Sequence, residues 1–500
     1  MRILRILVIA GLISGTAYAA AGASSLVDAV KSKDKDGVRT FLRQGADVKT
    51  PEADGTTALH WAAHWNDLET ADALLRAGAD VRAVNRYGAT PLSEAATNGS
   101  AALVERLLKA GADPNTLVTP QGQTVLMTAA RVGNTDAVKV LLEHGAYVDA
   151  RENFRGQTAL MWAAAEGHTP VAKLLLDHGA DHRARSSDRD TTAPKLSNGT
   201  PAAPISRGGL TALLFAVRQS QAETVKALLD GGADINEPDS DGNNAIVLAL
   251  LNSHYDLAQM LIDLAADVNT ANKQGRTALY TAVDMKDEDW SPLPLRRVED
   301  QHTGLDIVRM LLARGANVNA QLTAASPIPK VAQDTGDRTL AAGATAFMRA
   351  ARSGDVPVMK LLLEQKADPK LANKNGLTAL MLASGVGWDE KIKGSEAEAL
   401  EAAKLCVELG LDLNSATDRG ETALHGAALR GADSIVKFLV EKGANINAAD
   451  KAGLTPLDVA MGKVANGAPR EPHDSTVKLL TQLGGKNGEP KKEEKKAEGP

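Results

Sequence analysis

The chain has 500 residues, of which 44% are hydrophobic and only 3% aromatic, and its formal net charge is −6. This acidic balance argues against a nucleic-acid-binding protein, which needs a basic face. A mean hydropathy of −0.18, without internal apolar runs of about 18 residues, excludes a multi-span membrane protein.

The first residues have the pattern of a secretory signal peptide. Arg2 and Arg5 precede an apolar stretch at 6–13, and the Ala-Tyr-Ala sequence at 17–19 fits the small-residue cleavage rule. The apolar stretch is too short for a membrane span, which needs about 20 residues. We therefore expect cleavage near Ala19 and an exported protein, periplasmic or secreted, without a membrane anchor. A buried first helix is the alternative interpretation.

A unit of about 33 residues then repeats along the chain. Most successive copies begin 33 or 34 residues apart, and the longer intervals of 53, 68 and 44 residues contain insertions. The copies are anchored at Thr57, Thr90, Thr124, Thr158, Thr211, Asn244, Thr277, Thr345, Thr378, Thr422 and Thr455.

Each copy carries the signals of two short helices. A turn glycine such as Gly88 precedes the anchor residue, whose side chain caps the first helix. Paired alanines follow and permit close helix approach. A second helix carries paired leucines and ends at a glycine such as Gly78 or Gly179, where a left-handed C-terminal cap is expected.

This pattern resembles the ankyrin repeat, from the T-P-L-H-like start to the L-L-x-x-G-A-D-V-N end, over residues 25 to 485. The resemblance implies an all-α repeat solenoid of stacked helix–turn–helix units, each with a β-hairpin finger. Stability then comes from stacking between neighbours, because one unit cannot bury its own apolar face.

The expected order of segments follows from the anchors. It is a signal peptide (1–19), an N-terminal capping helix pair (24–52), ten repeats (53–85, 86–118, 120–152, 154–185, 207–239, 240–272, 273–321, 341–373, 374–416 and 418–450), a C-terminal capping repeat (451–485) and a disordered charged tail (486–500). Insertions are expected at 186–206 and 322–340, which interrupt fingers, and at 286–302, 386–398 and 462–474, which separate the two helices of a repeat. The 286–302 insertion includes Trp290 among charged residues, and whether the insertions are functional stays open.

Motifs for catalysis or metal binding are weak. Two S-x-x-K matches, at 434–437 and 475–478, lie where second helices begin and lack the accompanying elements of such enzymes. His60 and His64 have a spacing that can chelate a metal, but the sequence suggests no third ligand. Cys406 lies in a helical apolar pattern and is interpreted as a core residue. We expect no catalytic residues, no cofactor and no metal.

The resemblance implies that a partner binds the concave face made by the finger tips and first helices. The fourth residue after each anchor is expected to point there, which selects Trp61, Glu94, Thr128, Trp162, Phe215, Leu248, Thr281, Arg349, Leu382 and Gly426. Trp, Tyr and Arg are the residue types that make interface hot spots. The predicted partner-binding set is Trp61, Trp65, Tyr87, Phe154, Arg155, Trp162 and Phe215. Alternatively, some of these aromatic side chains pack between adjacent units.

Three functions are compatible with these patterns. The favoured one is a non-catalytic scaffold of the cell envelope that holds a protein or peptide partner, and not nucleic acid. The second is an accessory or regulatory partner of an envelope enzyme, or a cryptic hydrolase that acts through an insertion. The third is a ligand or metal chaperone centred on His60 and His64.

Overall fold

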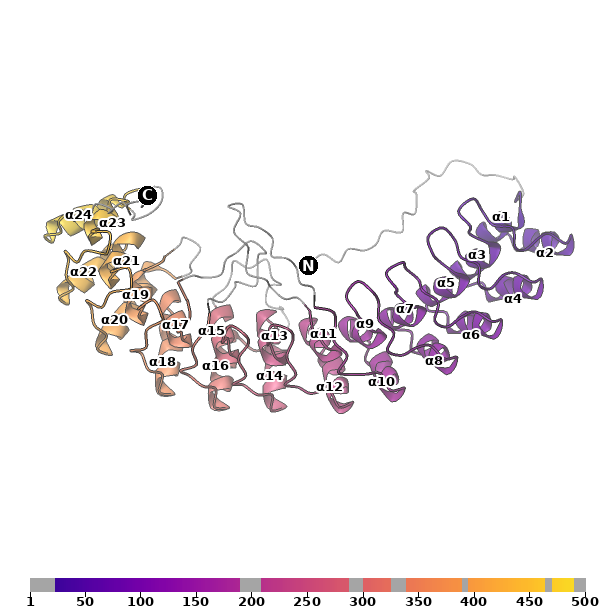
Figure 1. The fold of residues 1–500 in the computed structure, drawn as a ribbon, viewed down its shortest axis with the longest axis horizontal. Coiled ribbons are helices and arrows are strands. Elements are labelled where there is room, and N and C mark those ends of the chain that lie inside the picture. Colours follow the sequence, from indigo (N-terminus) through magenta and orange to yellow (C-terminus); the bar gives the residue numbers. More distant parts are fainter. Residues whose placement is uncertain are drawn as a thin grey trace, which may run out of the picture. The chain divides into compact units, whose positions relative to one another are not determined.

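The computed structural model describes residues 23–188, 208–286, 300–324, 339–388, 394–463 and 470–489. They form two compact units, an N-terminal one with helices α1 to α12 and a C-terminal one with helices α13 to α24 (Figure 1). The predicted signal peptide, Trp290 and the tail from residue 490 onwards lie outside the described residues. No helix in the described ranges combines the length and the apolar character needed to cross a bilayer.

The N-terminal unit consists of six helix pairs. Within it, each odd-numbered first helix packs on the first helices of the neighbouring pairs and on its own second helix. The helices are α1 (Leu26–Lys31), α2 (Lys35–Arg43), α3 (Ala58–His64), α4 (Leu68–Arg76), α5 (Pro91–Thr97), α6 (Ala101–Lys109), α7 (Val125–Val132), α8 (Thr135–Glu143), α9 (Ala159–Glu166), α10 (Thr169–Asp177), α11 (Ala212–Arg218) and α12 (Ala222–Asp230).

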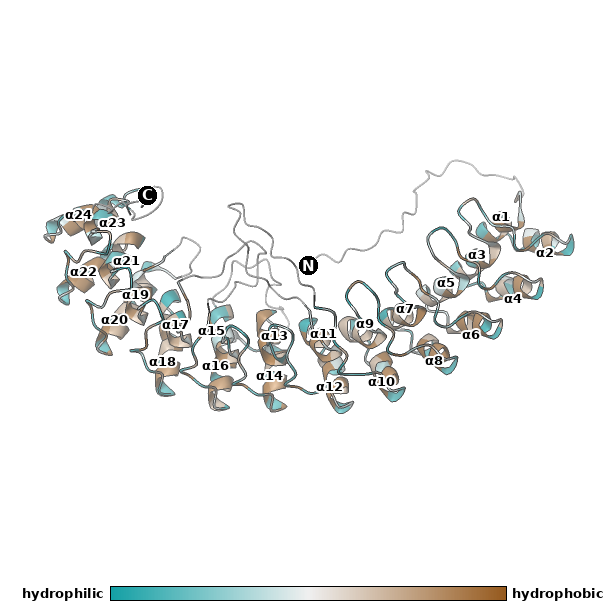
Figure 2. Cartoon of the chain, in the orientation of Figure 1, coloured by the Kyte–Doolittle hydropathy of each residue, from teal (hydrophilic) through white to brown (hydrophobic). Residues whose placement is uncertain are grey.

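The C-terminal unit has the same plan. Its most apolar first helix is α13, and Figure 2 contrasts its colour with the hydrophilic α2. The helices are α13 (Ala245–Leu251), α14 (Tyr255–Asp263), α15 (Ala278–Lys286), α16 (Gly304–Ala313), α17 (Ala346–Ser353), α18 (Val356–Glu364), α19 (Ala379–Ser384), α20 (Glu396–Glu408), α21 (Ala423–Arg430), α22 (Asp433–Glu441), α23 (Pro456–Ala460) and α24 (Asp474–Gln482).

The predicted caps are confirmed. The Thr90 hydroxyl accepts from the amide of Ser93, the Asn244 side chain accepts from the amide of Val247, and both residues immediately precede a first helix. Gly78 and Gly179 have φ angles of +87° and +82°, in the left-handed region expected after a second helix. These local signals are the reason that the repeat period predicts the helix pairs.

The fingers differ from the expected β-hairpins. In the described residues, β-pairing is limited to three isolated bridges, such as the one between Leu117 and Thr124, and no strand is formed. Side chains hold the finger turns instead: the Asn85 side chain accepts from the amides of Tyr87 (3.0 Å) and Ala89 (2.9 Å). Successive fingers are joined by backbone bonds, as from Arg86 N–H to the carbonyl of Asp54 (2.7 Å).

A ladder of asparagine side chains joins the turns that follow the second helices. The Asn269 amide group donates to the carbonyl of Gly315 (3.1 Å) and accepts from the backbone amide of Asn317 (2.6 Å). Asn319, in the next turn of the same unit, makes the same pair of bonds, and so does Asn115 within the N-terminal unit. We call this the asparagine ladder, and each of its members links two neighbouring repeats of one unit.

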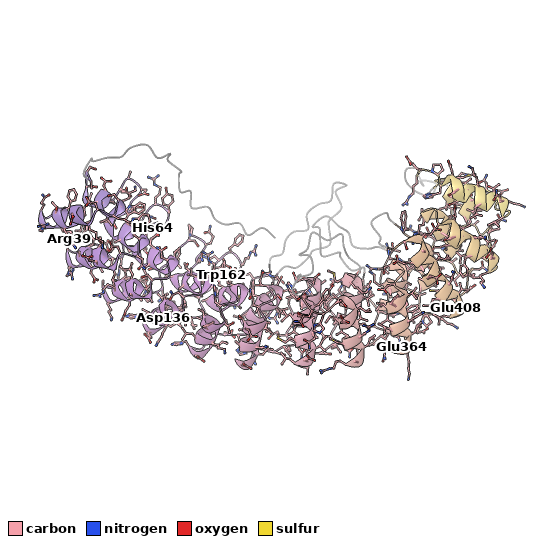
Figure 3. The ribbon with its side chains drawn as sticks, turned by 180° about the vertical axis from the view of Figure 1, so that it is seen from behind. Arg39, His64, Asp136, Trp162, Glu364 and Glu408 are labelled. Carbon is pink, nitrogen blue, oxygen red and sulfur yellow. The ribbon has the colours of Figure 1, made fainter. Side chains whose placement is uncertain are left out.

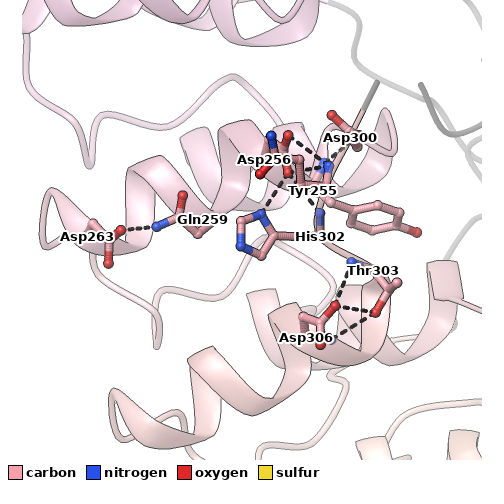
Figure 4. A network of polar contacts seen from close by, with 9 residues as sticks. Tyr255, Asp256, Gln259, Asp263, Asp300, His302, Thr303 and Asp306 are labelled. Carbon is pink, nitrogen blue, oxygen red and sulfur yellow. Dashed lines mark hydrogen bonds and ion pairs between the residues drawn. The ribbon is translucent and has the colours of Figure 1, made fainter. Parts of the chain in front are cut away.

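The end of the 286–302 insertion and the residues that follow it are held by hydrogen bonds. After the 287–299 segment, the chain re-enters the C-terminal unit on α14, where Asp256 accepts from the amides of Gln301 and His302 and from the His302 ring (2.7 Å) (Figure 4). Partial burial opposes ionisation of Asp256, but these three donors together lower its pKa. Thr303 and Asp306 then form a capping box that starts α16.

One segment predicted to be disordered begins in an ordered conformation. The charged tail was expected from residue 486, yet Lys486 N–H donates to Asn447 (2.7 Å) and the carbonyl of Lys486 accepts from Thr455 (2.7 Å). Residues 486–489 therefore lie against the last repeat, because its end leaves hydrogen-bonding groups of the ladder and of the cap available.

Candidate partner-binding surface

In each unit, the odd-numbered helices and the fingers that precede them form one side, which we call the first-helix face. Figure 3 shows His64 and Trp162 on this face of the N-terminal unit, with Asp136 on the side of the second helices. In the N-terminal unit, the fourth and seventh residues after the caps include two tryptophans, a histidine and two arginines.

Helix α3 carries a cluster of three rings. The centroids of Trp61 and Trp65 are 6.1 Å apart with an interplanar angle of 24°, and His64 lies edge-on to both, at 5.6 and 4.7 Å. This spacing follows from the sequence, because residues three and four apart share one side of a helix. Trp61 is half-buried, and Trp65 keeps 38% of its surface exposed.

Charged groups fix the orientation of these rings. The Trp61 indole N–H donates to Glu52 (2.8 Å), which also pairs with Lys31 (2.7 Å). The ammonium groups of Lys31 and Lys33 lie 4.8 Å from the Trp61 ring and 3.9 Å from the Trp65 ring. We call Trp61, His64 and Trp65, with the two lysines, the N-terminal aromatic cluster; its cation–π contacts favour rings that are held in place before a partner arrives.

Further along the same unit, arginines lie over aromatic rings. The guanidinium of Arg131 is 5.3 Å from the half-buried Trp162 ring, and that of Arg155 is 5.5 Å from Phe154. Arg218 lies 4.9 Å from Phe215. We call these three pairs the arginine–aromatic stripe. It combines the two residue types that carry most binding energy at protein interfaces.

The finger tips of the N-terminal unit present two aromatic side chains to solvent. Tyr87 and Phe154 keep 70% and 50% of their surface exposed. Exposure alone does not mark a binding face, because Tyr147 is also 70% exposed and lies in the turn after α8, on the asparagine ladder. Tyr87 and Phe154 differ from Tyr147 in lying on the fingers beside the first helices.

The expectation that the fourth residue after each cap points outwards is wrong at most positions. Seven of the ten selected side chains are buried. Phe215 is only 3% exposed, so it is removed from the predicted partner-binding set. The Arg218 guanidinium lies over the Phe215 ring, and the Arg349 guanidinium pairs with Asp284 of the neighbouring first helix α15. The seven buried residues are Thr128, Phe215, Leu248, Thr281, Arg349, Leu382 and Gly426.

The histidine at the third position after the cap has a structural role. His60 Nδ1 accepts from the amide of Thr57 (3.2 Å), and its Nε2 contacts the carbonyl of Ala89 (3.0 Å) on the next finger. Burial lowers the pKa of His60, and the same holds for His425. Both ring nitrogens of His60 are thus engaged, and His64 Nδ1 contacts Glu94 (3.0 Å), so the two histidines do not form a prepared metal site.

Cys406 is confirmed as an interior residue. It is fully buried within α20, and burial raises the pKa of its thiol to about 12. A thiol in this state is unreactive, because the thiolate is the nucleophilic form.

An ionic cluster in the C-terminal unit escaped prediction. Asp284 lies between Arg276 (2.7 Å) and Arg349 (2.6 Å), and none of the three side chains is more than 13% exposed. Burial opposes the charge of Asp284, but the two guanidinium groups lower its pKa to about 2. The sequence signal that could have pointed to Asp284 was its position in the repeat. Asp284 is the seventh residue after a cap, the position that His64 and Arg131 occupy in the other unit.

Comparison with known proteins agrees with this architecture. Models described as ankyrin repeats in three or many copies match residues 26–118, 94–186, 191–272, 213–322, 302–393 and 407–460. Together these ranges cover most of the chain and include both units.

Individual relatives match shorter stretches. The human ankyrin repeat and SOCS box protein 16 is 35% identical over 192 residues, 35% of this chain and 42% of that protein. The ankyrin repeat domain-containing protein OPG015 of monkeypox virus is 38% identical over 85 residues, 17% and 20% of the two chains. A transient receptor potential cation channel subfamily A member 1 homolog of Caenorhabditis elegans is 33% identical over 118 residues, 24% and 9%.

In each case the matched stretch is less than half of the relative's length. The likeness therefore concerns the repeats and not the whole of any relative. The chain belongs to the ankyrin-repeat family, and its repeats form a scaffold for protein–protein interaction.

Proposed function

We propose that the chain is an exported, non-catalytic scaffold that holds a protein or peptide partner on the first-helix face of its N-terminal unit. The observation that carries the proposal is the N-terminal aromatic cluster, where two tryptophans stack with their centroids 6.1 Å apart, together with the exposed Tyr87 on a finger of the same unit. Large apolar groups that stay in contact with water in an isolated chain mark interaction sites when they gather in one region.

The binding region would be centred on Trp61, Trp65 and Tyr87. Trp61 is held by Glu52 and Trp65 by Lys33, so little side-chain freedom is lost when a partner docks. Preorganisation of this kind favours affinity, because ordering the side chains is part of the cost of binding.

Export is the second part of the proposal and rests on the pattern of residues 1–19 alone. It predicts that the mature chain begins at Ala20 or within a few residues of it. N-terminal sequencing or intact-mass measurement of protein from the native envelope fraction tests this, and a retained Met1 would refute it.

The binding part is tested by the variant W61A/W65A/Y87A. Each buried aromatic contributes on the order of 2 kcal/mol at a hot spot, so capture of the native partner should fall strongly. Helical circular dichroism should barely change, since the buried alanines and leucines of α3 and α4 carry the packing. Quantitative co-purification from the native envelope is the measurement.

Two controls keep the result interpretable. Tyr147→Ala removes an equally exposed aromatic side chain outside the first-helix face, and K139A/K173A alters the second helices; both should leave capture unchanged. If the triple variant unfolds α1 to α5, the rings are core residues and the proposal fails. If it stays folded and captures partners with unchanged affinity, the binding face lies elsewhere.

A further inference from the structure

The chain that follows α24 makes contacts which, in the inner repeats, belong to the next finger. We propose that residues 486–489 form a strap that stands in for the finger of a following repeat and closes the outer side of the last helix pair, α23 and α24. The inference goes beyond the proposed function, because it concerns the C-terminal unit and requires no partner.

The first step is what an inner repeat receives from its neighbour. The third residue after the cap reaches the finger that follows. His60 Nε2 contacts the carbonyl of Ala89 at 3.0 Å. In the other unit, His425 Nε2 contacts the carbonyl of Leu454 at 3.1 Å. Ala89 and Leu454 each lie immediately before the cap of the next repeat, so the start of that repeat satisfies the histidine side chain.

In the described part of the chain no finger follows α24, and the strap makes this contact instead. The third residue after the last cap is Asp458, whose carboxylate accepts from the amide of Gly488 (2.7 Å). His60 and His425 reach 29 residues ahead, and Asp458 reaches 30. The inner fingers present a carbonyl at this point, whereas the strap presents an amide. An ionised carboxylate, which only accepts hydrogen bonds, is therefore the matching side chain.

The second step is the path of the strap. Asn447 accepts from the amide of Lys486 (2.7 Å) and donates to the carbonyl of Gly484 (3.4 Å), which continues the asparagine ladder. From the equivalent glycine of an inner repeat, Gly443, the chain takes twelve residues to reach the next cap. The strap reaches Asp458 at the fourth residue after Gly484, so it bypasses the finger and keeps only its contact with the preceding repeat.

The third step is the burial of the groups that the strap covers. The Asp458 side chain is only 1% exposed and also pairs with Lys463 (2.6 Å). Burial opposes the charge of Asp458, but the donors from Lys463, Gly488 and Thr455 together lower its pKa. The Thr455 hydroxyl in turn donates to the carbonyl of Lys486 (2.7 Å). Because a buried charge is costly without such donors, the strap belongs to the set of contacts that keeps Asp458 ionised in the interior.

The close approach of the strap depends on a glycine. An added Cβ at Gly488 would overlap the carbonyl oxygen of Gly453, the turn glycine of the last finger. The φ angle of Gly488 lies outside the left-handed region, so alanine at this position would be opposed by the overlap and not by its own backbone. The preceding Asn487 is exposed and takes no part in these contacts, which makes it a matched control.

The test compares Gly488→Ala with Asn487→Ala in the full chain by hydrogen exchange. We expect G488A to expel the strap, so exchange in α23 and α24 should rise by about tenfold or more, the effect of two lost hydrogen bonds of ordinary strength. N487A should stay within about twofold of the wild type, as is usual for an exposed substitution. Protection of α19 and α20 should be the same in both variants, because a stacked array passes a local change mainly to its neighbours.

A pair of truncated chains separates the strap from the residues beyond it. Removal of residues 490–500 should leave exchange in α23 and α24 unchanged. Removal of residues 486–500 should reproduce the increase expected for G488A, because it deletes the donor at Gly488 together with the Lys486 groups that bond to Asn447 and Thr455.

Three results would overturn the inference. Equal exchange in G488A and N487A would show that the close approach to Gly453 is not needed. Equal exchange in the two truncated chains would show that residues 486–489 do not stabilise the last pair. A uniform rise from α13 to α24 in G488A would indicate a general loss of stability and not the opening of one end. None of these results bears on W61A/W65A/Y87A, whose substitutions lie in the other unit.

Discussion

The two units are built from the same helix pairs but use the first-helix face differently. In the N-terminal unit the fourth and seventh residues after the caps include Trp61, His64 and Arg131, all at least partly accessible. In the C-terminal unit the same positions include Asp284 and Arg349, which pair in an ionic cluster with little solvent exposure. The caps and paired small residues therefore fix the stacking, while the face positions remain available either for binding or for internal stabilisation.

Removing Asp284 should produce the largest difference in local stability between the two units. Asp284→Ala leaves Arg276 and Arg349 buried without that carboxylate, and breaking a buried ion pair from one side costs about 3–5 kcal/mol. Hydrogen exchange should rise in α15 to α17 and stay unchanged in α3 to α9. Glu441→Gln, which disrupts an exposed contact with Lys437, is the control and should cost less than about 0.5 kcal/mol. Equal protection in D284A and wild type would contradict the role of the cluster.

Lowering the pH should weaken the same part of the C-terminal unit that Asp284→Ala weakens. The pKa of Asp284 is about 2 in the folded chain against its ordinary value of 3.8, so its contribution to stability is complete above about pH 4 and is lost as the pH falls towards 2. The shift corresponds to about 2 kcal/mol. Exchange-monitored stability of α15 to α17 should therefore decline over this range, and D284A should show a shallower decline there. Parallel acid profiles for the two proteins would exclude Asp284 as the cause.

Substituting the glycines that end the second helices should lower the local stability of the two units by similar amounts. Gly78 and Gly443 have φ angles of +87° and +97°, and an added Cβ would meet no atom within 4 Å at either site. Valine at these positions should therefore cost only backbone strain, about 1–3 kcal/mol. The loss of exchange protection should be centred on the substituted pair and its neighbours. Uniform loss over both units would mean that the array does not behave as a stack of local contacts.

Neutralising Lys33 should have the smallest effect and should be confined to the N-terminal unit. Its ammonium lies 3.9 Å from the Trp65 ring, and a cation–π contact at an exposed site contributes about 0.5–1 kcal/mol. Lys33→Gln should lower the stability of α1 to α4 by this amount, measured by hydrogen exchange, and Lys33→Arg should retain it. A loss of similar size in Lys33→Arg would show that the positive charge over the Trp65 ring is not the cause.

The sequence alone could predict the helix pairs because their signals are local. A cap such as Thr90, a turn glycine such as Gly88 and a closing glycine such as Gly179 each act within a few residues, and the structure confirms all three. The finger strands were not predictable in this way, since pairing across a finger depends on side chains such as Asn85 that can replace strand bonds in the turn.

The candidate site was predictable only in part. The i to i+4 spacing of Trp61 and Trp65 places both on one side of α3, whereas the burial of Phe215 depends on Arg218 lying over its ring. Asp284 and Arg349 are 65 residues apart and lie in different repeats, so no pattern within one repeat connects them. A contact between two repeats can be predicted only when it is known how the two repeats align in the stack.

The asparagine ladder has a consequence for how such a chain can change in length. Asn115, Asn269 and Asn319 each bond to the following repeat through the same two atoms, so the turns that carry them are chemically equivalent. Removing the whole repeat between Asn269 and Asn319 would join Asn269 to the same kind of backbone groups that Asn319 meets now. A deletion of any other length would leave the turn out of phase. Removal or duplication of a whole repeat between two such asparagines therefore keeps the ladder bonds, which turns with another residue at this position, such as Arg82, do not share.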